Sequence, residues 1–191
     1  MPGRCSVGHD GALDGTEPCG RQRGRSAQAV RHLVAASRRC LASVAGPLDM
    51  SAGLDHLRGF VDATRAAEMP AAADRAAYGD FTEAGGHRAM KLLLERTPEI
   101  DGVFVASDLM CLGALHALRE SGRRVPEDVA VVGFDDVPLA SCSKPPLTTI
   151  RQPIRMLGQE MVRSLLHRLS EPLGKPTPII LPTELVVRSS A

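Results

Sequence analysis

Two adjacent carboxylates, Asp135 and Asp136, directly follow the most apolar run of the sequence, Val129–Phe134. Carboxylates in this position could bind a metal, accept a phosphoryl group or clamp the hydroxyls of a ligand. They could also be simple turn residues before Pro138, because Asp is common where a strand enters a loop. Sequence alone favours the turn slightly and leaves the other three uses open.

A second candidate is Phe81, one of only four phenylalanines, which stands in the polar stretch Gly79–Thr82. It is either a core residue beneath the following helix or an aromatic platform for the apolar face of a sugar or base. The histidines do not cluster along the chain at metal-ligand spacing, so we expect no metal site. The Walker, G-x-S-x-G, H-E-x-x-H and G-x-G-x-x-G motifs are all absent.

The amino-acid composition indicates a globular protein and argues against a free-standing nucleic-acid binder. The chain has 191 residues, 43% of them hydrophobic and 24% charged, which is ordinary for a globular protein. The formal net charge is +1, and there is one Tyr and no Trp. A free-standing nucleic-acid binder needs a basic excess or stacking aromatics, and this chain offers neither.

The five cysteines are odd in number and form no C-x-x-C pair, so neither a disulfide framework nor a zinc ribbon is expected. The first residues lack the apolar core of a signal peptide, and no apolar stretch is long enough to span a bilayer. We therefore expect a cytoplasmic protein with no membrane partner.

Short apolar runs alternate with amphipathic segments from residue 25 onward, which predicts an α/β fold with a parallel sheet flanked by helices. We expect Ser26 to cap the first helix and Asp108 to cap a helix ending at Gly122. Ligands of such sheets bind at the carboxyl ends of the strands. Those ends are predicted at 46–51, 79–81, 107–108, 135–136 and 151–152.

The two ends of the chain differ from this pattern. Residues 1–24 hold few large apolar residues and no helical or strand period, which predicts disorder. Near the other end, an apolar stripe predicts a long helix beginning at Pro153, and residues 179–187 predict a closing strand that Pro182 places at an edge or bulge. The stripe consists of Ile154, Leu157, Met161, Leu165 and Leu169.

Taken together, the motifs resemble the LacI/GalR (lactose and galactose repressor) family of bacterial transcription regulators over residues 24–191. The two most specific blocks are Val-Gly-Phe-Asp-Asp and Leu-Thr-Thr-Ile-x-Gln. The segments that carry the resemblance, in family order, are 31–34, 44–48, 57–60, 78–81, 106–110, 112–114, 125–136 and 146–153.

This resemblance implies a periplasmic-binding-protein-like type I fold, represented essentially by its second lobe plus one helix of the first. Residues 25–152 and 178–191 would form the second lobe, and 153–177 a helix and linker that normally pack in the first lobe. The family's DNA-binding headpiece, hinge and most of the first lobe have no counterpart here, which we interpret as truncation, from a mis-called start, a degenerate gene or a genuine half-repressor.

The resemblance also implies an effector site. Asp135 matches an acid that accepts hydrogen bonds from the effector, Phe81 an aromatic that stacks on it, and Ser107 a small polar position. Gln152 lies at the crossover between lobes. His56 stands where the family usually has Arg, whose forked and permanently charged donor His does not reproduce.

The implied function is sensing of a small sugar-like effector by a LacI-type transcriptional regulator that acts as a homodimer when complete. No enzyme activity and no cofactor are expected, and DNA would be bound only through the headpiece. The alternatives are a solute-binding protein of an uptake system and a non-functional gene fragment. A single lobe offers about half the contacts, so we expect weak or undetectable effector binding, no operator binding, and an apolar helix that is exposed, repacked or self-associating.

Overall fold

The computed structural model describes residues 21–69, 75–170 and 181–191. Six strands form one sheet in the order β2-β1-β3-β4-β5-β6. Strands β1 to β5 are all parallel, and β6 is antiparallel to β5. The strands are β1 Leu41–Ala45, β2 Ala76–Tyr78, β3 Gly102–Val105, β4 Ala130–Asp135, β5 Thr148–Arg151 and β6 Glu184–Val186. The helices are α1 Arg21–Ala35, α2 Ser51–Ala66, α3 Glu83–Arg96, α4 Asp108–Glu120, α5 Pro138–Cys142 and α6 Ile154–Ser170.

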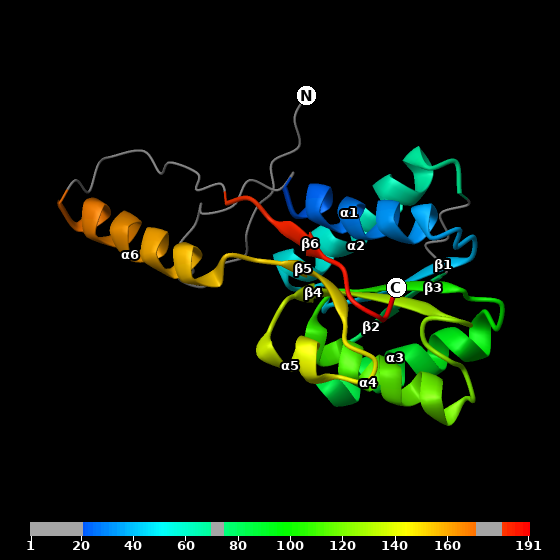
Figure 1. Ribbon diagram of the computed structural model, residues 1–191. Coiled ribbons are helices and arrows are strands. Elements are labelled where there is room, and N and C mark those ends of the chain that lie inside the picture. Colours follow the sequence, from blue (N-terminus) through cyan, green and yellow to red (C-terminus); the bar gives the residue numbers. More distant parts are fainter. Residues whose placement is uncertain (1–20, 70–74, 171–180) are drawn as a thin grey trace.

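The sheet lies between two helical layers, with α1 and α2 on one face and α3 and α4 on the other (Figure 1). Every residue of β1 and β3 is buried, as expected of parallel strands covered on both sides. The α1–α2 layer packs on the sheet through Leu33, Phe60, Phe104 and Phe134. The α3–α4 layer packs through a separate cluster that includes Met90, Met110 and Leu118. The predicted α/β class is confirmed.

Helices α3 and α4 cross at very short distance, which two glycines make possible. A Cβ atom on Gly86 would lie 2.1 Å from the Met110 carbonyl oxygen, and one on Gly113 would lie 1.9 Å from the Glu83 carbonyl oxygen. Neither position therefore tolerates a side chain unless the helices separate. The relative position of these two helices is consequently fixed by backbone contact.

The prediction for the start of the first helix was wrong. Helix α1 begins at Arg21, so Ser26 lies inside it rather than at its N-cap. Ser26 is fully buried, and its hydroxyl hydrogen-bonds the His56 Nδ1 atom at 3.2 Å. Disorder was predicted for residues 1–24, but residues 21–24 form the first turn of α1. Residues 1–20 and the linker residues 171–180, where a lobe boundary was predicted, lie outside the described residues.

Three helices end in the same hydrogen-bonding pattern, but only one of them uses glycine. The second residue beyond the helix has positive φ in each case: Ser37 after α1 (63°), Glu68 after α2 (54°) and Gly122 after α4 (71°). In each case the following amide bonds a carbonyl five residues earlier, such as Arg38 N to Leu33 O and Arg123 N to Leu118 O. This is the Schellman ending, in which glycine avoids the strain of a left-handed conformation.

Replacing Ser37 by glycine is expected to raise the free energy of unfolding by about 1 kcal/mol, because the left-handed conformation costs a side-chain-bearing residue about that much. Ser37→Ala, which keeps a Cβ, is the matched control and should leave stability nearly unchanged. Gly122→Ser should lower stability by a similar amount. Chemical denaturation of the three variants measures this. A Ser37→Gly variant no more stable than Ser37→Ala would contradict the explanation.

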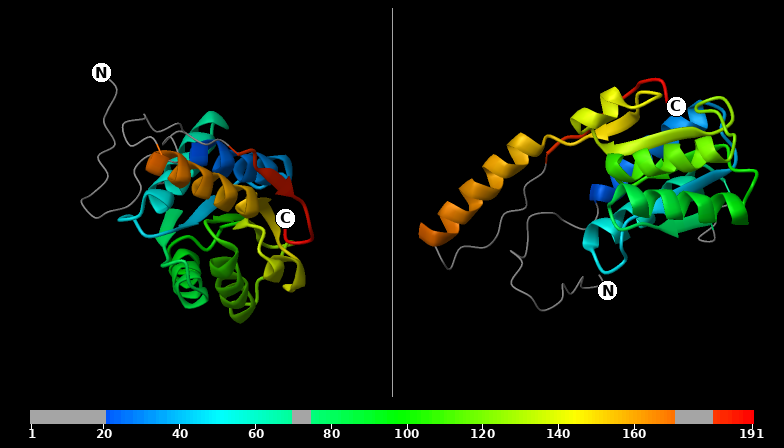
Figure 2. Two further views of the ribbon diagram at one scale, coloured as in Figure 1. Left: turned by 90° about the vertical axis from the view of Figure 1, so that its left-hand side faces the viewer. Right: turned by 90° about the horizontal axis from the view of Figure 1, so that it is seen from below.

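Helix α6 projects away from the layered body, as Figure 1 and the right-hand view of Figure 2 show. None of its described residues is buried, and Met161, Leu165 and Leu169 are 42%, 42% and 71% exposed. The predicted apolar helix therefore exists and lies exposed, while its self-association stays a prediction. Its hydropathy is mixed, and no helix of the described part of the chain is both long and apolar enough to cross a membrane.

The chain closes on the sheet through β6 and the residues that follow it. A strand was predicted over 179–187; residues 179–180 lie outside the described residues, and of 181–187 only 184–186 form β6, which lies at the sheet edge. Ser190 is fully buried; its hydroxyl donates to the Val131 carbonyl and accepts from the Thr148 amide. The C-terminal residues are therefore an integral part of the packed body.

Candidate functional site

The carboxyl ends of the five parallel strands meet at one edge of the sheet, as the sequence predicted. Following these strands are Gly46 after β1, Gly79 after β2, Ser107 after β3, Asp136 after β4 and Gln152 after β5. Asp135, the last residue of β4, lies at the same edge. Polar groups and tight turns are concentrated here.

Asp135 and Gln152 form a direct pair at this edge. The Gln152 Nε2 group donates to Asp135 Oδ1 at 2.7 Å, and β4 and β5 are paired immediately beside them, with Asp135 opposite Arg151. Asp135 is partly buried and has a φ of 110°, a strained conformation for a residue other than glycine. Strained residues of this kind are held in place by their surroundings and concentrate at binding sites.

Burial raises the pKa of Asp135 to about 6, and the nearby Asp108 carboxylate adds to the rise, although the hydrogen bond from Gln152 opposes it. At neutral pH Asp135 is therefore a desolvated carboxylate with acceptor capacity beyond its bond to Gln152. Such a group gains strongly from new hydrogen-bond donors, such as hydroxyl or amino groups of a ligand.

Because the pKa of Asp135 is higher in the folded than in the unfolded chain, its contribution favours folding below about pH 3.8 and is lost as pH rises through about 6. Asp135→Asn should abolish that dependence. We expect the stability of this variant relative to the parent to rise by about 2 kcal/mol between pH 4 and pH 7.5. Urea denaturation across this range measures the difference, and a constant difference would contradict the assignment.

Asp136 plays a different part from its neighbour. Burial by itself would raise its pKa, but hydrogen bonds from Arg151 and Arg188 outweigh burial and leave the pKa lowered. The distances are 2.6 Å from Arg151 Nε to Oδ2 and 2.7 Å from an Arg188 guanidinium nitrogen to Oδ1. Asp136 thus ties the end of β5 and the C-terminal segment to the loop, and its carboxylate is already fully engaged.

Asp108, the first residue of α4, links β5 and the loop after β4 at the same edge through its carboxylate. It is 1% exposed, and its carboxylate accepts from the Thr149 hydroxyl at 2.7 Å and the Val137 amide at 2.9 Å. Burial raises its pKa. The expectation that Asp108 caps α4 was wrong: the N-cap is Ser107, whose hydroxyl accepts from the Met110 amide at 3.2 Å. Ser107 is 5% exposed and its hydroxyl proton is still available to a further acceptor.

Phe81 lies at the other side of the edge, after β2. Its ring covers Gly46, where a Cβ atom would lie 2.2 Å from the ring tip, and it also packs against the α3–α4 core cluster. The ring is only partly buried. Its loop is held rigidly, because Asp80 accepts hydrogen bonds from the Thr82 amide and hydroxyl and from Arg88. Both uses proposed from sequence, core packing and a ligand platform, fit this position.

His56 lies deeper than the other predicted site residues. It is 3% exposed; its ring meets the Phe134 ring edge-on at 4.3 Å between centroids and lies 5.9 Å from that of Phe104. The ring thus packs in the α1–α2 layer beneath the end of β4. The structure brings Asp135 and Gln152 into contact, places Ser107 and Phe81 at the same edge, and sets His56 under it.

Sequence reasoning missed a cluster on the outer face of α3 and α4, made of His87, His116 and Glu120. The spacing of His116 and Glu120, one helical turn apart, was the available signal. His87 could be added only when the crossing of the two helices was known.

Comparisons with known proteins give a consistent picture. Residues 30–191 match the family described as a periplasmic binding protein-like domain. The HTH-type transcriptional regulator CelR of Thermobifida fusca is 47% identical over 167 residues, which are 87% of this chain and 49% of that protein. The ribose operon repressor of Escherichia coli (strain K12) is 35% identical over 163 residues, 85% of this chain and 49% of the repressor.

Solved structures agree. The complex of the transcriptional regulator CelR with cellobiose has a TM-score of 0.86 and 46% identity, and the match covers 89% of this chain and 52% of that one. The lac repressor dimer bound to operator and the anti-inducer ONPF has a TM-score of 0.81 and 34% identity, with 89% and 58% covered. The chain therefore spans about half the length of the curated relatives it matches.

Proposed function

Because this chain belongs to the periplasmic-binding-protein-like family of LacI-type transcriptional regulators, we propose that it forms the half of an effector domain that senses a small sugar. The effector would lie on the carboxyl edge of the sheet. Regulation would then follow from differential binding of the effector to two arrangements of the domain, rather than from catalysis.

The observation that carries this proposal is the pairing of Asp135 with Gln152 at that edge. A desolvated carboxylate oriented by an amide is a good acceptor for the vicinal hydroxyls of a sugar. We assign Asp135 and Gln152 to the hydroxyls, Ser107 to a further polar contact, and Phe81 to the apolar face of a ring. His56 would act indirectly, by supporting Phe134 beneath Asp135.

The spacing of these groups favours a ligand larger than one sugar ring. Phe81 follows β2 and Asp135 ends β4, and the order β2-β1-β3-β4 separates them by three strand spacings, or about 14 Å. A disaccharide lying across β1 and β3 could reach both. The similarity to the CelR–cellobiose complex supports the same class, so we propose a glucose-containing disaccharide as effector.

A hybrid regulator tests the function. In this hybrid, residues 30–191 replace the matching half of CelR, which is 47% identical to them, so that a complete two-lobed domain and its DNA-binding part are present. We expect the hybrid to bind the CelR operator and to change its affinity when cellobiose or a related disaccharide is added. A folded hybrid that binds the operator but ignores a panel of mono- and disaccharides would contradict the proposal.

If this proposal holds, the complete regulator is a cytoplasmic homodimer. It would bind DNA through a part that corresponds to the half of the relatives' sequences that this chain does not match. The chain by itself would bind sugar only weakly, because one wall of a cleft buries too little of a small ligand. It would bind no operator by itself, and a gel-shift assay with the purified chain tests that.

A further inference from the structure

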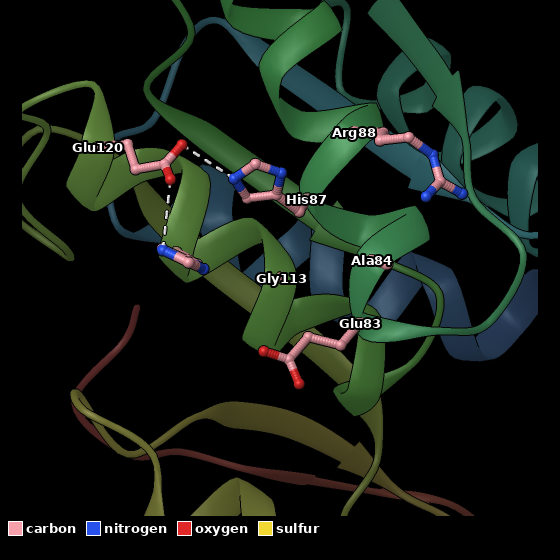
Figure 3. Close-up of a pocket in the computed structure, with 7 residues that line it drawn as sticks. Glu83, Ala84, His87, Arg88, Gly113 and Glu120 are labelled. Carbon is pink, nitrogen blue, oxygen red and sulfur yellow. Dashed lines mark hydrogen bonds and ion pairs between the residues drawn. The ribbon is translucent and has the colours of Figure 1, made fainter.

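The outer face of the α3–α4 layer carries three side chains with the ligand chemistry of a metal site. His87 Nε2 lies 2.9 Å from Glu120 Oε2, and His116 Nε2 lies 3.4 Å from Glu120 Oε1. One ligand atom from each of the three residues lies within 4.8 Å of the other two. In Figure 3 the Glu120 carboxylate points toward His87 between the two helices. The carboxylate thus bridges two imidazoles from different helices.

The backbone places these groups with little freedom. Gly86 and Gly113 lack side chains and so allow α3 and α4 to touch. Gly86 directly precedes His87, and Gly113 lies about one helical turn before His116. His116 and Glu120 are four residues apart and therefore share one face of α4. The two imidazole centroids are 5.1 Å apart and tilted by 55°. Such a rigid crossing reduces the conformational cost of bringing three ligands together.

We propose that His87, His116 and Glu120 form a surface site for a divalent transition metal ion, with zinc as the representative ion. Two imidazoles and one carboxylate are a ligand set that zinc uses in proteins, with a fourth position open to water or another ligand. At zinc–ligand distances near 2.1 Å, tetrahedral ligand atoms stand roughly 3.4 Å apart. Small side-chain rotations would bring the three ligand atoms to that spacing.

The site is also accessible to an ion. It opens into a hollow of about 460 Å³ lined by His87, His116 and Glu120 together with Glu83, Ala84, Arg88 and Gly113. The side chains of His87, His116 and Glu120 are 25%, 56% and 44% exposed. Each imidazole would bind the ion through an unprotonated ring nitrogen, because imidazole binds metal in its neutral form.

Two cationic side chains near the site, Lys91 and Arg88, differ in their expected effect on metal binding. The Lys91 ammonium lies 3.9 Å from Glu120 Oε2 and competes with a metal for that carboxylate. Arg88 instead bonds Asp80 and points away from Glu120 in Figure 3. Lys91 should therefore weaken metal binding, and its removal should strengthen it.

The test measures zinc bound per chain by equilibrium dialysis at pH 7.5 on the whole chain. We expect one ion at this site in the parent, its loss in His116→Asn, and at least threefold tighter binding in Lys91→Met. His167→Asn, which removes an exposed histidine of α6, is the matched control and should leave binding unchanged. Saturating zinc should raise the melting temperature of the parent and of the control but not that of His116→Asn, because the ion joins α3 to α4.

Cobalt substitution distinguishes this site from binding to cysteine. Cobalt held by two imidazoles and a carboxylate shows d–d bands without the thiolate charge-transfer absorption of a cysteine-bound ion. Absence of binding in the parent, thiolate absorption in the cobalt form, or the same zinc content in the parent and in His116→Asn would each overturn the proposal. Circular dichroism of His116→Asn, a change at an exposed position, establishes that the variant is folded.

Discussion

Asp108→Ala is expected to lower the free energy of unfolding by about 3 kcal/mol, the largest loss for any single polar residue at the sheet edge. The change leaves two donors without their acceptor, the buried Thr149 hydroxyl and the partly buried Val137 amide. Each unsatisfied buried group costs about 1–3 kcal/mol. Chemical denaturation measures the loss directly.

Asp108→Asn provides the matched comparison. Its amide oxygen can still accept from Val137, and its amide nitrogen can donate to Thr149 after the hydroxyl rotates. We expect it to lose less than half as much stability as Asp108→Ala. A double-mutant cycle with Thr149→Val should give a coupling of at least about 1 kcal/mol. Equal losses for Ala and Asn would show that the hydrogen bonds are not what Asp108 contributes.

The second large effect concerns the effector. In the hybrid regulator, Asp135→Asn is expected to weaken disaccharide binding by about 10- to 100-fold, because hydrogen bonds to a charged acceptor contribute about 1.5–3 kcal/mol each. The asparagine keeps the acceptor for Gln152, so the loop should retain its shape. Isothermal titration with cellobiose measures the change.

Glu127→Gln is the control for this measurement, because Glu127 is exposed and precedes β4, at the opposite end of the strand from Asp135. It should bind as the parent does. Since the pKa of Asp135 is about 6, affinity of the parent hybrid should also fall as pH drops below 6, while that of Asp135→Asn should not. An Asp135→Asn hybrid with unchanged affinity would remove Asp135 from the site.

Much of the carboxyl edge could be predicted from sequence because it depends on local patterns. The apolar runs at 41–45 and 102–105 are strands, and Phe81, Ser107 and Gln152 follow strands as expected.

What the sequence did not reveal depends on contacts between distant segments. Asp135 and Asp136 are adjacent and chemically identical, and only the positions of Arg151 and Arg188 make one of them an engaged structural anion. The residues next to His56 in the sequence do not indicate that its ring packs against two phenylalanine rings from distant strands. His87 and His116 are 29 residues apart, and the helix crossing alone brings them together.

The central claim is that the carboxyl edge of this sheet binds a sugar, and an NMR titration of the isotope-labelled chain with cellobiose tests it most directly. We predict saturable shift changes at Phe81, Ser107, Asp135 and Gln152, with a dissociation constant on the order of 1 mM because only one lobe contributes. Residues of the α3–α4 outer face should not shift. Shift changes confined to that outer face, or none at this edge with any glucose-containing disaccharide at tens of millimolar, would contradict the account.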